Sequence, residues 1–253
     1  MANANGINDA NTVAGTDGNS RAFVVAPGQP TPTFLPAAEG PGTTSEVAFG
    51  INNANVIVGQ EASANSGTTP GFVYRNGAFT LLNPVANAVV TNAQAINNNG
   101  LVAGFYSTDA VHQHGFLYDT VNSTYRLIAD PVVANLLLTQ FLGINDNDIA
   151  VGYWQDFGGS QHGFLYDIAN GQYSFLDDPD AALTGPSITQ ITGINDHGEI
   201  AGFYVDAATG LQRGFVGVAA AAVPEPATLA LVAAGLAACV ARRRGETKRA
   251  RGG

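Results

Sequence analysis

The chain has 253 residues, of which 45% are hydrophobic and only 12% charged, and it contains 31 glycines. Low charge with many apolar and aromatic residues argues against intrinsic disorder and indicates an ordered, turn-rich protein. Six of the ten basic residues lie in the last twelve positions, which leaves four basic against nineteen acidic side chains in residues 1–241. So acidic a body repels phosphate backbones, and we therefore expect no nucleic-acid partner.

A ten-residue motif, called here the hairpin word, occurs five times, and its copies start 44, 45, 48 and 50 residues apart. Its second residue is always Ile, its third Asn and its tenth Gly. Each copy indicates a hairpin, because its centre is rich in Asn, Asp and Gly, which tolerate a positive φ. We expect the Asn side chain to fix the turn and the last Gly to lie where strands approach closely. The copies are Gly6–Gly15, Gly50–Gly59, Ala95–Gly104, Gly143–Gly152 and Gly193–Gly202.

Two shorter words follow each hairpin word. The second is Arg21–Val25, Pro70–Tyr74, His114–Tyr118, His162–Tyr166 and Arg213–Gly217. The third, which the fifth repeat lacks, is Thr33–Pro36, Phe79–Pro84, Tyr125–Pro131 and Tyr173–Pro179. Together with the run before each hairpin word, every full repeat offers four short apolar runs bounded by turn residues, which indicates four strands.

Four antiparallel strands repeated about a centre are the plan of a propeller blade. We predict an all-β fold for residues 1–218, a five-bladed β-propeller with blades of about 45 residues, the last blade lacking one strand. A linear β-solenoid is the alternative. The words between Gly6 and Val218 closely resemble the HAF family of bacterial extracellular repeats. That resemblance implies an exported, propeller-like repeat protein and carries no established chemistry.

The C-terminal region has a different composition. An Ala/Pro linker, residues 219–226, ends in Val223, Pro224, Glu225 and Pro226, and an uncharged apolar run follows at 227–241. The basic tail, 242–253, opens with Arg242, Arg243 and Arg244. The run is about 22 Å long as a helix, short of a bilayer core of roughly 30 Å. We predict one short transmembrane helix with its basic end in the cytoplasm and the repeats outside.

This tail closely resembles the PEP-CTERM sorting signal of Gram-negative bacteria. The resemblance implies recognition by a membrane-embedded exosortase, removal of the tail, and release or attachment at the cell surface, in the setting of an exopolysaccharide or biofilm matrix. A plain membrane anchor is the alternative. Cys239 is interpreted as a small apolar residue, with lipidation as the alternative. Because the first residues lack the features of a signal peptide, we expect the true start to lie upstream and leave the total blade number open.

Candidate chemistry elsewhere is sparse. His114 and His162 occupy the same position in their repeats, and we interpret that position as a strand edge. We therefore do not expect them to form a metal site with His112. Asn145 to Asp148 lack the ligand spacing of a calcium loop, and Asp177, Asp178 and Asp180 are interpreted as turn residues. No known catalytic motif is present. We predict no enzymatic activity, no cofactor and no metal; a propeller-type glycan hydrolase or lyase at the cell surface is the alternative.

One feature suggests binding. The second strand of the hairpin word ends in aromatic pairs, Phe105-Tyr106, Tyr153-Trp154 and Phe203-Tyr204. Neighbours on a strand face opposite sides, so Tyr106, Trp154 and Tyr204 are candidates to stack on sugar rings, unless both members pack between blades. The sequence thus predicts an exported non-enzymatic repeat protein that contacts exosortase during sorting and polysaccharide afterwards.

Overall fold

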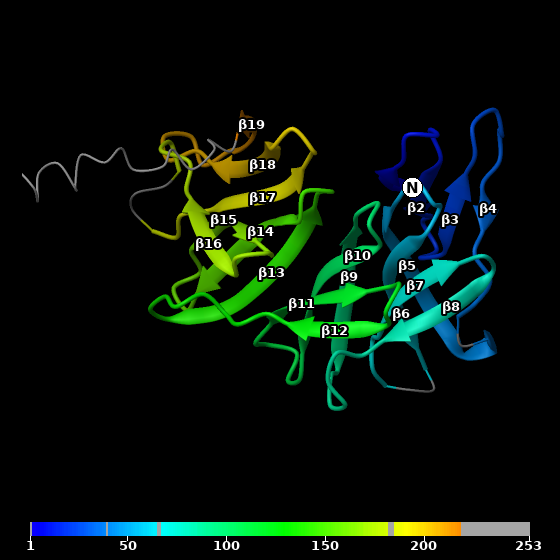
Figure 1. The fold of residues 1–253 in the computed structure, drawn as a ribbon. Coiled ribbons are helices and arrows are strands. Elements are labelled where there is room, and N and C mark those ends of the chain that lie inside the picture. Colours follow the sequence, from blue (N-terminus) through cyan, green and yellow to red (C-terminus); the bar gives the residue numbers. More distant parts are fainter. Residues whose placement is uncertain (1, 39, 65–66, 182–184, 219–253) are drawn as a thin grey trace, which may run out of the picture. The chain divides into compact units, whose positions relative to one another are not determined.

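The structure is a computed structural model that describes residues 2–38, 40–64, 67–181 and 185–218. These residues form nineteen β-strands and one short 3₁₀ turn at Gly40–Gly42. The strands assemble into five antiparallel sheets, each built from consecutive strands of the chain (Figure 1). The predicted all-β fold is confirmed.

Each sheet corresponds to one repeat of the sequence and is called a blade. Blade 1 contains β1 (Asn3–Ile7), β2 (Val13–Thr16), β3 (Ala22–Val25) and β4 (Thr33–Phe34). Blade 2 contains β5 (Thr43–Ile51), β6 (Ile57–Ser63), β7 (Gly71–Arg75) and β8 (Ala78–Leu82). Blade 3 contains β9 (Val90–Ile96), β10 (Leu101–Ser107), β11 (His114–Asp119) and β12 (Thr124–Leu127). Blade 4 contains β13 (Leu136–Ile144), β14 (Ile149–Asp156), β15 (Gln161–Asp167) and β16 (Gln172–Leu176). Blade 5 contains β17 (Thr189–Ile194), β18 (Glu199–Val205) and β19 (Gln212–Val218).

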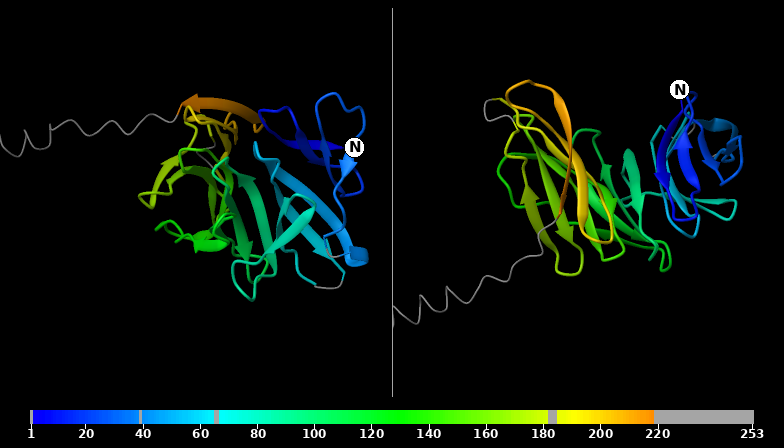
Figure 2. Two further views of the ribbon diagram at one scale, coloured as in Figure 1. Left: turned by 45° about the vertical axis from the view of Figure 1, so that its right-hand side comes forward. Right: turned by 90° about the horizontal axis from the view of Figure 1, so that it is seen from above.

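The blades follow one another in space as they do in sequence (Figure 2). The first strand of each blade contacts the first strand of the next, as in the pairs β1 with β5, β5 with β9, β9 with β13 and β13 with β17. The five Ile-Asn words line one common pocket at the ends of these strands. The fold is therefore a five-bladed β-propeller, and the solenoid alternative is wrong. The fifth blade has three strands among the described residues, as predicted.

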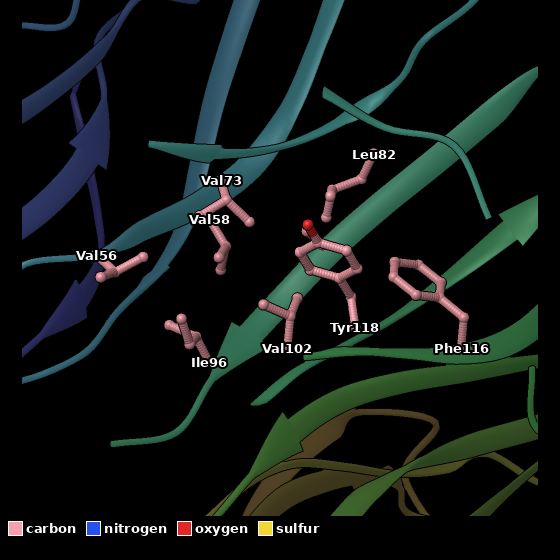
Figure 3. Packing of buried hydrophobic residues seen from close by; sticks show 9 residues of the cluster. Val56, Val58, Val73, Leu82, Ile96, Val102, Phe116 and Tyr118 are labelled. Atoms are coloured by element: carbon pink, nitrogen blue, oxygen red, sulfur yellow. The ribbon is translucent and has the colours of Figure 1, made fainter. Parts of the chain in front are cut away.

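The hydrophobic core lies between blades. Figure 3 shows one such layer, in which Val58 and Val73 of blade 2 lie among Val102, Phe116 and Tyr118 of blade 3. Strand alternation explains the layer, because every second residue of a strand points to the same face. Blades 2, 3 and 4 thus bury one face against the preceding blade and the other against the following one, and blade stability depends on packing in the array.

The hairpin turn has the same construction in all five repeats. The sixth residue of the hairpin word has a positive φ each time, at Asn11, Asn55, Gly100, Asp148 and Gly198. The fifth residue does not, so the turn differs from the two-residue turn in which both central residues are left-handed. In blade 3 the Gly100 N–H donates to the Asn97 carbonyl (3.1 Å) and the Asn97 N–H donates to the Leu101 carbonyl (3.1 Å). The turn is thus a four-residue loop that ends in one left-handed residue.

The last Gly of the hairpin word lies opposite a β-bulge in the preceding strand. In blade 3, β9 has an irregularity next to Ala93, the residue that pairs with Gly104. A Cβ on Gly104 would overlap the Asn92 carbonyl oxygen, and the same overlap with a first-strand carbonyl exists at Gly15, Gly59, Gly152 and Gly202. The prediction of a close backbone approach is confirmed, and it explains why all five repeats end in Gly.

Candidate functional site

The three predicted aromatic residues occupy equivalent positions near the ends of β10, β14 and β18. Tyr106, Trp154 and Tyr204 are each half-buried. Their neighbours on the other face, Phe105 and Tyr153, are buried. The expected alternation is therefore present in blades 3 and 4, although none of the three rings is fully exposed.

Each of these rings lies opposite a residue that carries or can carry a positive charge. Tyr106 pairs across the strands with His114, Trp154 with His162, and Tyr204 with Arg213. The Trp154 and His162 rings are stacked, with centroids 4.2 Å apart and an interplanar angle of 22°. One face of the Trp154 indole is therefore covered by a side chain of its own blade.

A carboxylate completes each pair. His114 Nδ1 lies 2.7 Å from Asp130 Oδ2, and His162 Nδ1 lies 2.8 Å from Asp177 Oδ2. In blade 5, Arg213 Nε lies 2.6 Å from Asp206 Oδ2. Blades 3, 4 and 5 thus repeat a set of an aromatic ring, a basic side chain and an acid, called here the aromatic triads. The sequence indicated the first two members by repeat phase; Asp130 and Asp177 lie at the ends of the third word, at positions that differ by one residue, and Asp206 lies in a loop outside the repeated words.

Two polar atoms of the aromatic triads are buried without a hydrogen-bond partner among the described residues, Asp130 Oδ1 and Trp154 Nε1. Burial is also the main cause that raises the pKa of Tyr106, and the negative charge of Asp130 raises it further. An unpaired buried carboxylate oxygen is costly, and it is a hydrogen-bond acceptor for a donor that reaches it from outside.

An outer groove of about 350 Å³ lies beside the aromatic triads of blades 3 and 4. Asp130 and Val132 line its blade 3 side, and Tyr166, Tyr173 and Phe175 line its blade 4 side. Phe175 is half-exposed and its ring contacts Trp154 edge-on, with centroids 6.2 Å apart. The Tyr173 hydroxyl donates to the Ala129 carbonyl (3.1 Å) and so connects the two sides. Sequence reasoning missed this groove because Tyr173 and Phe175 belong to the variable third word, and Tyr166 of the second word was predicted only as part of a strand.

The axial pocket, of about 290 Å³, is lined by the Ile-Asn words of all five blades. Buried Asn side chains connect successive blades there: Asn8 Nδ2 donates to the Asn52 carbonyl (3.1 Å), and Asn52 Nδ2 to the Asn97 carbonyl (3.1 Å). Asn97 and Asn145 continue the series. Other side chains of this pocket also join neighbouring blades; for example, Asn98 Nδ2 of blade 3 donates to Asp146 Oδ2 of blade 4 (2.8 Å). These polar groups hold the blades together, and the pocket is a structural centre.

The histidines considered for a metal site are not gathered at one point. His112 Nδ1 lies 2.7 Å from Asp109 Oδ2, within its own loop, and His114 and His162 contact separate carboxylates. The contact with His112 lowers the pKa of Asp109 well below its ordinary value. Among residues 2–218, apart from the gaps, no three His, Cys, Asp or Glu side chains are grouped as metal ligands would be.

The sorting residues lie outside the described residues. Val223 to Pro226, the apolar run at 227–241 and Arg242 to Arg244 all fall in 219–253. Within the part that the structure describes, no helix has the length and apolar character of a membrane span. The predicted transmembrane helix therefore stays a prediction.

Comparison with known proteins bears on the tail and on the fold separately. Residues 222–244 match the family model of the PEP-CTERM protein-sorting motif. Among curated proteins, none matches this chain. The family of the repeats themselves stays a prediction.

Solved structures resemble the propeller at very low sequence identity. The structure of "putative TolB from Agrobacterium tumefaciens" has a TM-score of 0.61 at 9% identity, covering 87% of this chain and 77% of that one. A prolyl endopeptidase gives 0.54 at 10% identity, covering 87% of this chain and 36% of the other. TolB from Acinetobacter baumannii gives 0.51 at 8% identity, covering 86% and 54%. These likenesses concern the fold alone. The chain is a five-bladed β-propeller with a PEP-CTERM protein-sorting motif in its tail, a motif that implies exosortase processing and export.

Proposed function

We propose that the protein is an exported, non-enzymatic binding scaffold that exosortase releases from its tail and delivers to the cell surface or to the extracellular polysaccharide matrix. The sorting motif supports the route, because its residues 222–244 follow directly on the last blade. The apolar run holds the chain in the inner membrane until the tail is removed, and the propeller is the part that remains outside.

The outer groove is the proposed contact with polysaccharide, and it is the observation that carries the binding role. Phe175 offers an exposed ring for the apolar face of a sugar, while the Asp130 carboxylate, which lines the groove, is a hydrogen-bond acceptor for a hydroxyl group. Small-ligand sites combine apolar walls with a few fixed polar groups in this way. Trp154 packs edge-on against Phe175. Tyr106 and Tyr204 occupy the positions equivalent to Trp154 in blades 3 and 5.

Binding fits this surface better than catalysis does. The carboxylates of the aromatic triads are each held by a basic side chain, at 2.6 to 2.8 Å. General acid–base hydrolysis of a glycosidic bond needs two carboxyl groups facing the same bond, one of them with a raised pKa. Asp130, Asp177 and Asp206 belong to different blades and have their own partners.

The test is affinity electrophoresis of the full chain, in mild detergent, through gels that contain bacterial exopolysaccharides. Phe175→Ala should weaken retardation by about fivefold, since a stacked ring contributes on the order of 1 kcal/mol. Phe34→Ala is the matched control, because Phe34 pairs with Phe23 in blade 1 as Phe175 pairs with Phe164 in blade 4. Equal effects of the two variants would contradict the assigned groove, and turnover of a polysaccharide that one carboxylate substitution abolishes would favour the hydrolase.

A further inference from the structure

Blade 5 exposes the face that each of the other four blades buries against the blade that follows it. Position nine of the hairpin word is fully buried in the first four blades, at Ala14, Val58, Ala103 and Val151. The equivalent Ala201 of blade 5 is exposed. On β19, Val216 is 80% exposed, whereas its equivalent Leu117 on β11 is 2% exposed. These side chains point to where a following blade would pack.

The first blade leaves the opposite face bare. Ile51, Ile96 and Ile144 each pack towards the preceding blade and are 8% exposed, whereas the equivalent Ile7 is 64% exposed. Ile7 on blade 1, and Ala201 and Val216 on blade 5, are the same residue types that the other blades bury at these positions. Natural monomers rarely leave such matched apolar surfaces open to water.

Among the described residues, the hydrogen bonds and close contacts that join successive blades also end at blade 1 and at blade 5. The side-chain amide of Asn195 donates to Glu199 Oε2 of its own blade (2.6 Å), where the other four Asn residues donate to a carbonyl of the next blade. A Cβ on Gly143 would touch Gly193 of blade 5, whereas a Cβ on Gly193 would meet no heavy atom within 4 Å. Among the described residues, no hydrogen bond joins blade 5 to blade 1.

We propose that these two bare faces, Ile7 on blade 1 and Ala201 and Val216 on blade 5, form a docking site for one further blade. Its occupant is a partner polypeptide segment that carries one more copy of this repeat, with its own Ile-Asn hairpin. The four observed interfaces specify this chemistry, because each joins the two faces that are bare here. One inserted blade would pack against both faces, and its own Asn would continue the hydrogen-bond series between Asn195 and Asn8.

A second whole copy of the chain fits the observations less well. A head-to-tail pair would cover blade 5 of one copy and blade 1 of the other, and it would leave one face of each copy bare. A single inserted blade leaves neither face bare, and it also supplies hydrogen bonds at both ends of the Asn series. The proposal does not depend on the polysaccharide groove, which lies in blades 3 and 4.

Cysteine labelling tests the docking site. Two variants of the full chain in mild detergent, both with Cys239→Ser, carry Ile7→Cys or Val216→Cys and react with a water-soluble maleimide. The probe is a polypeptide of residues 89–135, which contains blade 3. We expect a 1:1 complex by native mass spectrometry and labelling slowed by about tenfold or more at both positions. A Val132→Cys variant, on an exposed loop of blade 3, should keep its rate.

The matched control probe carries Ile96→Glu and Asn97→Ala, which remove the packing and the amide that the site requires. Equal protection by both probes would overturn the proposal. So would protection that rises with protein concentration in the absence of probe, since a second copy would then be the occupant. Because an isolated blade can fail to fold, a second arm joins residues 89–135 directly ahead of Asn3. Unchanged labelling of both cysteines in that fusion would also overturn the proposal.

Discussion

The side-chain amide of Asn97 in blade 3 donates to the main-chain carbonyl of Asn145 in blade 4, at 3.1 Å and 48 residues apart in sequence. The same side chain uses its oxygen to accept the Leu101 N–H (2.8 Å), which closes its own hairpin turn. One buried Asn therefore fixes a turn and joins two blades. This double role accounts for Asn at the third position of the hairpin word in the first four repeats, while Asn195 of the fifth keeps the turn contact alone, accepting the Glu199 N–H (2.9 Å).

Asn97→Ala should lower the free energy of unfolding by about 2–3 kcal/mol, because it leaves a buried carbonyl and a turn N–H without partners. Asn195→Ala is the matched control, since Asn195 is exposed and donates only within its own blade. Its effect should stay below about 1 kcal/mol. Urea unfolding followed by tryptophan fluorescence measures both, and equal losses would contradict the connecting role.

Gly104→Ala should destabilise the protein by about 1–3 kcal/mol or more, because the new methyl group would overlap the Asn92 carbonyl at the bulge. Gly193→Ala adds the same methyl group in open space and should change stability little. Thermal unfolding of the two variants gives the comparison. Similar melting temperatures would show that the bulge relaxes without cost.

Gly100→Val tests the hairpin turn. Gly100 has φ +84°, a conformation that a β-branched residue adopts only with strain. A Cβ would also lie 2.7 Å from Thr120 Oγ1. We expect a loss of about 1 kcal/mol or more, seen as a lower urea midpoint. Gly100→Asn should cost less than Gly100→Val, because Asn has the equivalent left-handed position in blade 2, and both variants share the contact with Thr120.

Glu46 should make stability depend on pH. Its side chain is buried on β5 and lies opposite Glu61, and burial is the main cause that raises its pKa, with the charge of Glu61 adding to it. The folded state therefore holds this proton more tightly than the unfolded state does. Stability from this residue is complete below the ordinary Glu pKa and is lost as pH rises through the higher folded value.

Glu46→Gln should accordingly stabilise the protein at pH 7 relative to its effect at pH 4. The amide oxygen can still accept the Ala38 N–H that the carboxylate accepts at 2.7 Å. Urea unfolding of wild type and variant across this pH range measures the difference. An effect of the substitution that does not change with pH would contradict the raised pKa.

Repetition is what made the fold predictable. Ile, Asn and Gly at fixed positions of the hairpin word gave the blade number, the strand order and the turn positions, because each residue meets one local constraint in every blade. The predicted Asn contact is present, since Asn52 Oδ1 accepts the N–H of Ala54 (3.1 Å). Its bond to the next blade was not predicted, because sequence spacing does not say which carbonyl lies beside a side chain.

The candidate surface was less predictable. Repeat phase placed Tyr106, Trp154 and Tyr204 correctly at one position, but not the rings and acids that surround them. Asp130 and Asp177 follow the fourth strands in loops of unequal sequence, and Phe175 takes a place that Leu127 fills in blade 3. Because these contacts differ from blade to blade, the repeat period of the sequence could not predict them.

In the proposed function, exosortase removes the tail of an exported propeller. The direct measurement is the intact mass of the surface protein from a host that carries exosortase, with secretion ensured by a working signal peptide. We expect a mature chain that lacks Cys239 and Arg242 to Arg244, while a Pro224→Ala, Glu225→Ala, Pro226→Ala variant keeps them. A surface-located wild-type protein with a full-length C-terminus would contradict the account and leave the tail as an anchor.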